Sequence, residues 1–169
     1  MLETCTLESK SSRINTITLS GYDDKEDSCA LQMDRDIALN DLRHDSFFQP
    51  AHDDYGPYAL ELYIEDNRLI FHIANNRGKD LPYLVLSINP YRRIIKDYFM
   101  ICQSYDEAVR EGKPSRVEAI DMGRRGIHNE GAELLLERLG DKIKLDIKTA
   151  RRLFTLICVL HAGKTHALR

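Results

Sequence analysis

The chain has 169 residues, 43% of them hydrophobic and 30% charged, as expected of one globular domain with a substantial core. A net charge of −3 and a pI near 6.1 disfavour a dedicated nucleic-acid-binding protein. No apolar run approaches the ~18 residues of a membrane span and no apolar signal region opens the sequence, so we expect a cytoplasmic protein without a membrane partner.

The first part of the chain predicts a disordered start, a strand and a helix. Residues 1–12 are polar and we expect them to be disordered, whereas β-branched residues over 13–20 favour a strand. After an acidic loop, Asp27 or Ser28 can cap a helix predicted over 30–44 by its apolar periodicity. The residues expected on its buried face are Leu31, Ile37, Ala38 and Leu42.

Three strands joined by tight turns follow a connection at 45–57. Alternating apolar residues predict strands over 58–64, 68–74 and 81–88. Short turns force neighbouring strands to pair antiparallel, so these strands form a meander. Its apolar face needs a cover, which we expect the downstream helices to supply.

A long helix is predicted over 90–110. Asn89 suits the N-cap position, and the proline after it fits the first helical turn. Arg92, Arg93 and Lys96 lie in the first turns, where the positive end of the helix dipole disfavours cations. We therefore expect an acidic group of the protein or an anionic ligand nearby. The predicted apolar stripe comprises Tyr91, Ile94, Ile95, Tyr98, Cys102, Tyr105 and Val109.

A further helix is predicted over 115–139, with polar residues bordering its apolar face. Asp121, Arg125 and His128 recur at helical spacing and form a row along the edge of that face, and Arg124 lies beside them. Half-buried charges of this kind need a partner or a ligand. The residues expected on the apolar side are Val117, Ile120, Ile127, Gly131, Leu134 and Leu135.

The glycines of this helix permit two interpretations. In one, Gly123 and Gly131 lie on the apolar side and allow another helix to approach closely. In the other, Gly126 ends a first helix and Asn129 caps a second. The second arrangement would place His128 and Asn129 beside free backbone N–H groups, which favour an anionic ligand. The sequence leaves both interpretations open.

Capping residues mark the remaining helix ends. Ser115 and Glu118 have the spacing of a capping box, and Asp146 is the expected N-cap of a final helix that Gly163 ends. The apolar centre of this final helix, 153–160, is expected to be the most buried helical segment. Together the elements predict one α+β domain over residues 13–163 and a flexible tail at 164–169. In that fold a strand and a helix precede the three-stranded antiparallel meander, and three to four C-terminal helices pack on the sheet.

Basic residues from two predicted helices indicate a candidate anion-binding site. Residues 1–80 carry a net charge of −8 and residues 81–169 a net charge of +5. The two halves could simply pack against each other, but arginines converging from two helices would form a pocket for phosphate, carboxylate or nucleotide. The leading functional hypothesis is therefore a small binding or regulatory protein. Its candidate ligand-binding residues are Arg92, Arg93, Lys96, Arg124, Arg125, His128 and Asn129.

Three other interpretations compete with an anion site. The row formed by Asp121, Arg125 and His128 is also what a structural salt-bridge network produces, and this is the favoured structural interpretation. A hydrolase or transferase would use His128 as general base, oriented by Asp121. A protein–protein adaptor would dock a partner or a second copy on its surface. Enzymatic activity is not the leading expectation, and the ligand, the partner and the oligomeric state are left open.

No cofactor or metal site is predicted. No two histidines have i, i+4 spacing, and the GRRG run from Gly123 lacks the lysine and hydroxyl of a phosphate-binding loop. The four cysteines contain no CxxC pair, and Cys102 and Cys158 fall on apolar helix faces, which favours inert reduced thiols. We expect His72 to face solvent or a cross-strand neighbour, and His52 to be exposed in a loop.

Three segments resemble a family of small uncharacterised proteins of alphaproteobacteria. They are RRIIKDYFMIC from Arg92, PSRVEAIDMGRRGIHNEGAELL from Pro114 and TARRLFTLICVLH from Thr149. The likeness spans roughly residues 13–161 and is strongest from Pro90 onward. It implies a bacterial, cytoplasmic protein of unknown function, and it brings no activity, cofactor or catalytic residue to this chain.

Overall fold

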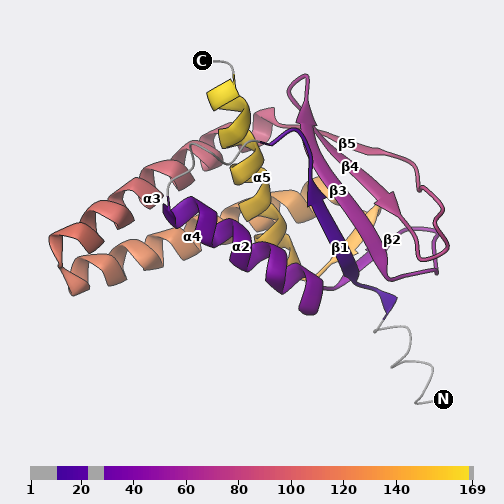
Figure 1. Cartoon of the computed structure of the whole chain (residues 1–169), viewed down its shortest axis with the longest axis horizontal. Helices are drawn as coiled ribbons and strands as arrows, with labels where there is room; N and C mark the ends of the chain where they lie inside the picture. Colours follow the sequence, from indigo (N-terminus) through magenta and orange to yellow (C-terminus); the bar gives the residue numbers. More distant parts are fainter. Residues whose placement is uncertain (1–10, 23–28, 168–169) are drawn as a thin grey trace, which may run out of the picture.

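The computed structural model describes residues 11–22 and 29–167, in which helices gather beside a mixed sheet (Figure 1). The predicted α+β class is confirmed. Residues 1–10 of the predicted disordered start and the capping candidates Asp27 and Ser28 lie outside the described residues, as do 168–169 of the predicted tail.

The larger sheet contains the predicted strand and the predicted meander. Its strands are β1 (Ile14–Leu19), β3 (Tyr58–Glu65), β4 (Arg68–Ala74) and β5 (Leu84–Ser87), in the order β1-β3-β4-β5. β3, β4 and β5 pair antiparallel, as predicted, whereas β1 pairs parallel to β3. One face of β3 and β4 is buried, and it consists of Leu60, Leu62, Ile64, Leu69, Phe71 and Ile73.

A second, two-stranded sheet lies where the sequence predicts only a connection. β2 (Phe48–Pro50) pairs antiparallel with β6 (Ile143–Leu145), so part of the connection predicted over 45–57 is a strand. β2 has three residues and ends in proline, which gives no detectable alternation. Its partner is almost a hundred positions later in the chain, so no local pattern could predict the pairing.

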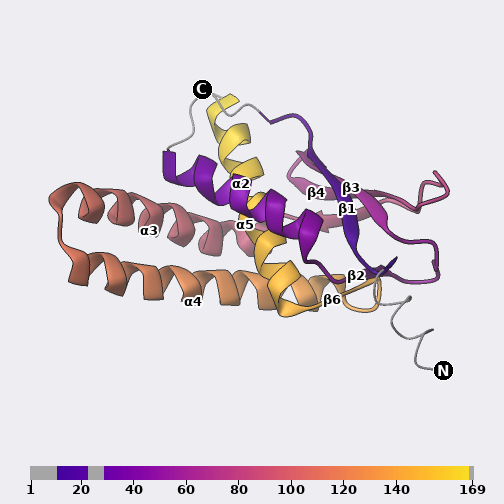
Figure 2. The ribbon, with the colours of Figure 1, turned by 60° about the horizontal axis from the view of Figure 1, so that its bottom comes forward.

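Among the described residues, three α-helices pack against a fourth, α5. They are α2 (Cys29–His44), α3 (Arg92–Glu111), α4 (Pro114–Leu139) and α5 (Ile147–Ala167). α5 contacts α2, α3, α4 and β3, and each residue from Leu153 to Leu160 is buried, as predicted. α3 and α4 form an antiparallel hairpin whose far end extends beyond the other helices (Figure 2). Within the described residues, no helix is long and apolar enough to cross a membrane.

The helix ends differ from the prediction at three positions. Asn89 does not cap α3: a short 3₁₀ helix, η1 (Asn89–Tyr91), intervenes, and the Asn89 side chain accepts a hydrogen bond from Asn67. Ser115 does not cap α4, which begins at Pro114 without a side-chain cap, because proline has no N–H to satisfy. Gly163 does not end α5, whose backbone continues to Ala167.

The N-cap of α5 is confirmed. Asp146 Oδ1 accepts a hydrogen bond of 2.8 Å from the Thr149 backbone N–H. The Thr149 hydroxyl in turn accepts a bond of 2.9 Å from the Phe47 backbone N–H, and Thr149 is buried. The first turn of α5 is therefore fixed both to its own cap and to the segment that leads into β2.

The glycines of α4 settle how this helix is built. α4 runs from Pro114 to Leu139 without interruption, so a break at Gly126 was wrong. An added Cβ at Gly131 would lie 2.5 Å from ring atoms of Phe154, and one at Gly123 would lie 2.8 Å from Ile101 Cδ1. The interpretation that Gly123 and Gly131 permit close helix packing is therefore confirmed.

Two residues predicted to be buried are exposed. Ile37 is 49% exposed, although Leu31, Ala38 and Leu42 are buried, because at about 100° per residue Ile37 lies a third of a turn away from that row. Val109 is 53% exposed because the outer end of the α3–α4 hairpin reaches beyond the helices that would cover it (Figure 2).

Candidate functional site

Arg124, one of the predicted ligand-binding residues, is already paired inside the protein. It forms a salt bridge with Asp34 of α2, and both side chains are largely buried. Asp34 Oδ2 also accepts a hydrogen bond of 2.6 Å from the Tyr98 hydroxyl on α3. The guanidinium carbon of Arg124 lies 5.5 Å from the centre of the Tyr105 ring. Arg124 therefore joins α2, α3 and α4 and is not available to a ligand.

The basic residues at the start of α3 point to partners on the surface. Arg93 forms a salt bridge of 2.5 Å with Glu130 of α4 and one of 3.5 Å with Asp97. Arg92 donates a hydrogen bond of 2.6 Å to the Asn67 side chain, and Lys96 is exposed. The acidic group expected near this helix start is thus Glu130 of the same protein.

The polar residues of α4 instead meet α5 around a cavity of about 460 Å³, here called the α4–α5 cavity. Three of the predicted residues line it, and Arg92, Arg93, Lys96 and Arg124 do not. The other three lining residues come from α5, where i, i+1 and i+4 spacing turns them to one side. The lining residues are Arg125, His128, Asn129, Arg151, Arg152 and Thr155.

The three arginines of the cavity differ in their partners. Arg125 Nη2 lies 3.3 Å from Asp121 Oδ2 on the exposed side of α4, and Arg152 Nη2 lies 2.8 Å from Asp41 Oδ2 of α2. Arg151 forms none of the ion pairs found among the described residues, and its Nε is buried there without a hydrogen-bond partner. Arg151 is therefore the arginine of the cavity for which the described residues supply no carboxylate partner.

His128 is enclosed between aromatic side chains. Its ring centre lies 5.4 Å from that of Tyr98 and 6.3 Å from that of Phe154, and Nε2 lies 3.4 Å from Thr155 Oγ1. Burial and, second, the charge of Arg124 lower the pKa of His128 to about 4. The imidazole is therefore neutral at pH 7 and can accept as well as donate a hydrogen bond.

The structure does not bring Asp121 and His128 together. They are seven residues apart on one continuous helix, a rise of about 10 Å. Asp121 pairs with Arg125, and the polar contact of His128 is Thr155. A general base at neutral pH also needs a pKa nearer to 7 than that of His128. The arrangement required for the hydrolase or transferase hypothesis is not formed.

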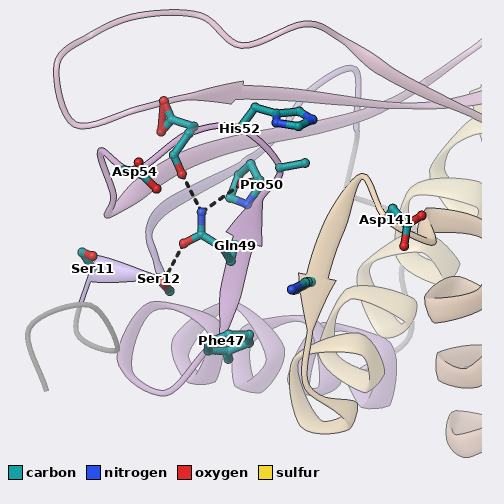
Figure 3. Close-up of a pocket in the computed structure, with 11 residues that line it drawn as sticks. Ser11, Ser12, Phe47, Gln49, Pro50, His52, Asp54 and Asp141 are labelled. Atoms are coloured by element: carbon teal, nitrogen blue, oxygen red, sulfur yellow. Dashed lines mark hydrogen bonds between the residues drawn. The ribbon is translucent and has the colours of Figure 1, made fainter. Parts of the chain in front are cut away.

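A larger cavity of about 800 Å³ lies beside β2 and is here called the β2 cavity (Figure 3). Gln49 accepts a hydrogen bond of 2.6 Å from Ser12 (Figure 3). It also donates one of 2.6 Å to the Asp53 carbonyl. The buried Asp53 carboxylate accepts bonds from Asn75 Nδ2 at 2.9 Å and from the Tyr55 backbone N–H at 3.1 Å. Burial alone raises the pKa of Asp53, but these hydrogen bonds outweigh it and hold the pKa below its usual value.

Metal ligation and thiol chemistry find no support in the described residues. No group of three or more His, Cys, Asp or Glu side chains there could hold a metal ion. Cys102 and Cys158 are buried free thiols, as predicted, and burial raises the pKa of both, that of Cys102 to about 11. His72 contacts its cross-strand neighbour Glu61 at 3.3 Å, also as predicted, and His52 is exposed.

Sequence comparison places the chain among alphaproteobacterial relatives of its own size. The chain is 53% identical over 131 residues to UPF0262 proteins of Agrobacterium fabrum and of Paramagnetospirillum magneticum, which is 78% of this chain and 83% of each relative. It is 52% identical over 132 residues to a UPF0262 protein of Brucella anthropi, which is 78% of this chain and 82% of that relative. No solved structure matches the chain. The profile of UPF0262, described as an uncharacterised protein family, matches residues 11–163, so the chain belongs to this family, as its resemblance predicted.

Proposed function

We propose that this protein binds a small anion in the α4–α5 cavity and serves as a binding or regulatory protein. The observation that carries the proposal is Arg151, whose Nε is buried without a hydrogen-bond partner among the described residues while its side chain lines the cavity. A buried N–H group without a hydrogen-bond partner is costly, so such a group usually has a ligand.

The charges around the cavity support an anion rather than a neutral ligand. Arg125 and Arg152 bring two further guanidinium groups, each with one carboxylate partner. Arg151 therefore leaves a net positive charge at the cavity. Burial, the charge of Arg124 and the charges of Arg152 and Arg151 lower the pKa of His128. Arginine is also the side chain best shaped to hold phosphate or carboxylate through paired hydrogen bonds.

The size and the neutral lining groups favour a small ligand. A volume of about 460 Å³ falls within the range of roughly 300–1,000 Å³ found for small-molecule sites. The Asn129 amide, the Thr155 hydroxyl and the neutral His128 ring can fix the orientation of an anion held by the arginines. These groups bind and orient, and none of them is suited to remove a proton at neutral pH.

Thermal unfolding in the presence of anions tests the proposal. Wild-type protein would be heated with inorganic phosphate, a mononucleotide or a dicarboxylate, each at low and at high salt. A ligand present at 100 times its Kd stabilises by about 2.7 kcal/mol, which raises Tm by several degrees in a chain of this size. We expect at least one anion to do so, and high salt to weaken the effect.

Two arginine variants locate the effect. Arg151→Met removes the guanidinium but keeps an apolar stem of similar length, and we expect it to abolish the Tm increase. Arg93→Ala is the matched control, because Arg93 is exposed and pairs outside the cavity, and we expect the increase to persist. If no anion raises Tm in the wild type, or if Arg93→Ala abolishes the effect and Arg151→Met does not, the proposal fails.

A further inference from the structure

The contacts of Thr155 determine which ring nitrogen of His128 can accept a hydrogen bond in the α4–α5 cavity. A threonine hydroxyl has a single proton. Thr155 Oγ1 lies 3.1 Å from the Arg151 carbonyl oxygen, one turn earlier in α5, and 3.4 Å from His128 Nε2. The carbonyl can only accept, so the hydroxyl proton goes to the shorter contact. The oxygen of Thr155 then accepts the proton on Nε2 of His128.

This assignment fixes which nitrogen of His128 carries a lone pair. A neutral imidazole with its proton on Nε2 has a bare acceptor at Nδ1. Among the described residues, Nδ1 has no hydrogen-bond partner, and it is not one of the fully enclosed polar atoms. The ring of His128 is tilted against that of Tyr98 and nearly perpendicular to that of Phe154, and His128 lines the cavity, so Nδ1 is the acceptor that this residue can offer there.

Arginine donors and an imidazole acceptor in one cavity demand a particular kind of ligand. The guanidinium groups need an oxygen that accepts, whereas Nδ1 of His128 needs a group that donates. An oxyanion without a proton would bring a lone pair against the lone pair of Nδ1, which is unfavourable. Resting on the proposed function, we propose that the ligand is an oxyanion carrying its own proton, hydrogen phosphate, and that His128 selects it over sulfate, which has the same shape but no proton.

The charged groups on the helices around His128 favour its neutral form, in which Nδ1 can accept a hydrogen bond. Arg124 of α4 and Arg151 and Arg152 of α5 disfavour a protonated ring, as does burial, while Asp34 of α2 favours it. Asp34 is held by Arg124 and by the Tyr98 hydroxyl. Because the pKa of His128 is about 4, the ring remains a neutral acceptor throughout the physiological pH range.

Calorimetric titration of the full chain with phosphate and with sulfate at pH 7.5 and equal ionic strength tests the selection. Discrimination by one buried lone pair corresponds to roughly a 10-fold or greater difference in Kd in favour of phosphate. His128→Gln offers an amide that can turn either its oxygen or its nitrogen to the ligand. We expect this variant to bind the two anions with Kd values within about threefold of each other.

Methyl phosphate tests whether binding requires a proton on the ligand, because it loses its last proton within the accessible pH range. Inorganic phosphate retains a proton into strongly alkaline solution, whereas methyl phosphate loses its last proton near pH 6. In wild-type protein, we expect the affinity for methyl phosphate to fall about tenfold between pH 6 and pH 8 while that for phosphate does not fall. In His128→Gln the two ligands should follow the same pH dependence.

The outcomes distinguish this inference from the function on which it rests. If wild-type protein binds sulfate as tightly as phosphate and Arg151→Met abolishes both, the cavity binds anions but His128 does not select among them, and the inference is overturned. If neither phosphate nor sulfate binds to the wild-type protein, the inference is overturned, and the proposed function fails as well only if the mononucleotide and the dicarboxylate also leave Tm unchanged. A wild-type preference for phosphate that survives in His128→Gln also overturns the inference.

Discussion

The two cavities of this protein differ in how well the chain satisfies its own polar groups. In the β2 cavity, a buried carboxylate has partners for both oxygens, Asn75 and Tyr55, and Gln49 ties the surrounding backbone together. In the smaller α4–α5 cavity, three arginines share two carboxylates, and a buried guanidinium nitrogen of Arg151 has no partner among the described residues. The proposed binding site is thus distinguished by its unmet hydrogen-bonding capacity and not by its volume.

This contrast implies opposite contributions to stability. A satisfied polar network holds the fold together, and removing a member leaves its partners unpaired in the interior. An unsatisfied group detracts from stability until a ligand arrives, a trade-off typical of binding sites. Substitutions in the two cavities should therefore change the free energy of unfolding in opposite directions and by different amounts.

The largest effect is expected in the β2 cavity. Asp53→Ala leaves Asn75 Nδ2 and the Tyr55 backbone N–H without their acceptor, and each unpaired buried group costs about 1–3 kcal/mol. We expect a loss of about 3 kcal/mol in the free energy of unfolding measured in urea. Phosphate affinity should be unchanged. An Asp53→Ala protein with the free energy of unfolding of the wild type would show that the hydrogen bonds of Asp53 do not stabilise the region around the β2 cavity.

The pH dependence of stability should report His128. Its pKa is about 4 in the folded protein against an ordinary value of 6.5 for histidine, so between these values the unfolded chain binds a proton that the folded protein does not. Stability from this group is fully present above pH 6.5 and is lost as the pH falls to about 4, a change of about 3 kcal/mol. The difference between urea curves of wild-type protein and His128→Gln isolates it. Parallel pH profiles of the two proteins would contradict the account.

A pair of glycine substitutions tests the contact that sets the distance between α4 and α5. Gly131→Ala places a methyl group against the Phe154 ring, and we expect a loss of about 2 kcal/mol in the free energy of unfolding. Gly126→Ala meets nothing within 4 Å and removes a glycine from a helix interior, so it should stabilise by about 0.5–1 kcal/mol. Equal effects at the two positions would mean that the helices are not in close contact at Gly131.

The smallest effect on stability is expected at Arg151. Arg151→Met removes an uncompensated cation, and without ligand we expect the free energy of unfolding to stay the same or to rise by up to about 1 kcal/mol. The same substitution should abolish binding of phosphate. A loss of more than about 1 kcal/mol in phosphate-free buffer would indicate that Arg151 has a structural partner.

Much of the fold could be predicted because its signals are local. Alternation in β3 and β4, the periodicity of the helices, the Asp146 cap and the apolar centre of α5 all depend on neighbouring residues. The pairing of β2 with β6 could not be predicted, since three-residue strands have no usable pattern and their contact is made only by the folded chain. The role of Gly131 could not be predicted within α4 alone, because its close contact is with Phe154 of α5.

The candidate site was half predictable for the same reason. Helical spacing brought Arg125, His128 and Asn129 to one side of α4, and all three line the cavity. Their partners on α5 depend on how two helices cross, which spacing within one helix cannot give. The arginines and Thr155 that interrupt the apolar sequence of α5 were the available signal. The basic start of α3 was misleading, because Arg93 finds Glu130 across the hairpin.

Nuclear magnetic resonance of the arginine side chains tests the central claim most directly. The Nε–H signal of Arg151, assigned by its absence in Arg151→Met, would be followed while phosphate is added to isotopically labelled protein. The account predicts that this signal shifts and saturates, while the Nε–H signal of Arg93 stays in place. An unmoved Arg151 signal, with shifts at Arg92 or Arg93 instead, would place the anion at the start of α3 and contradict the account.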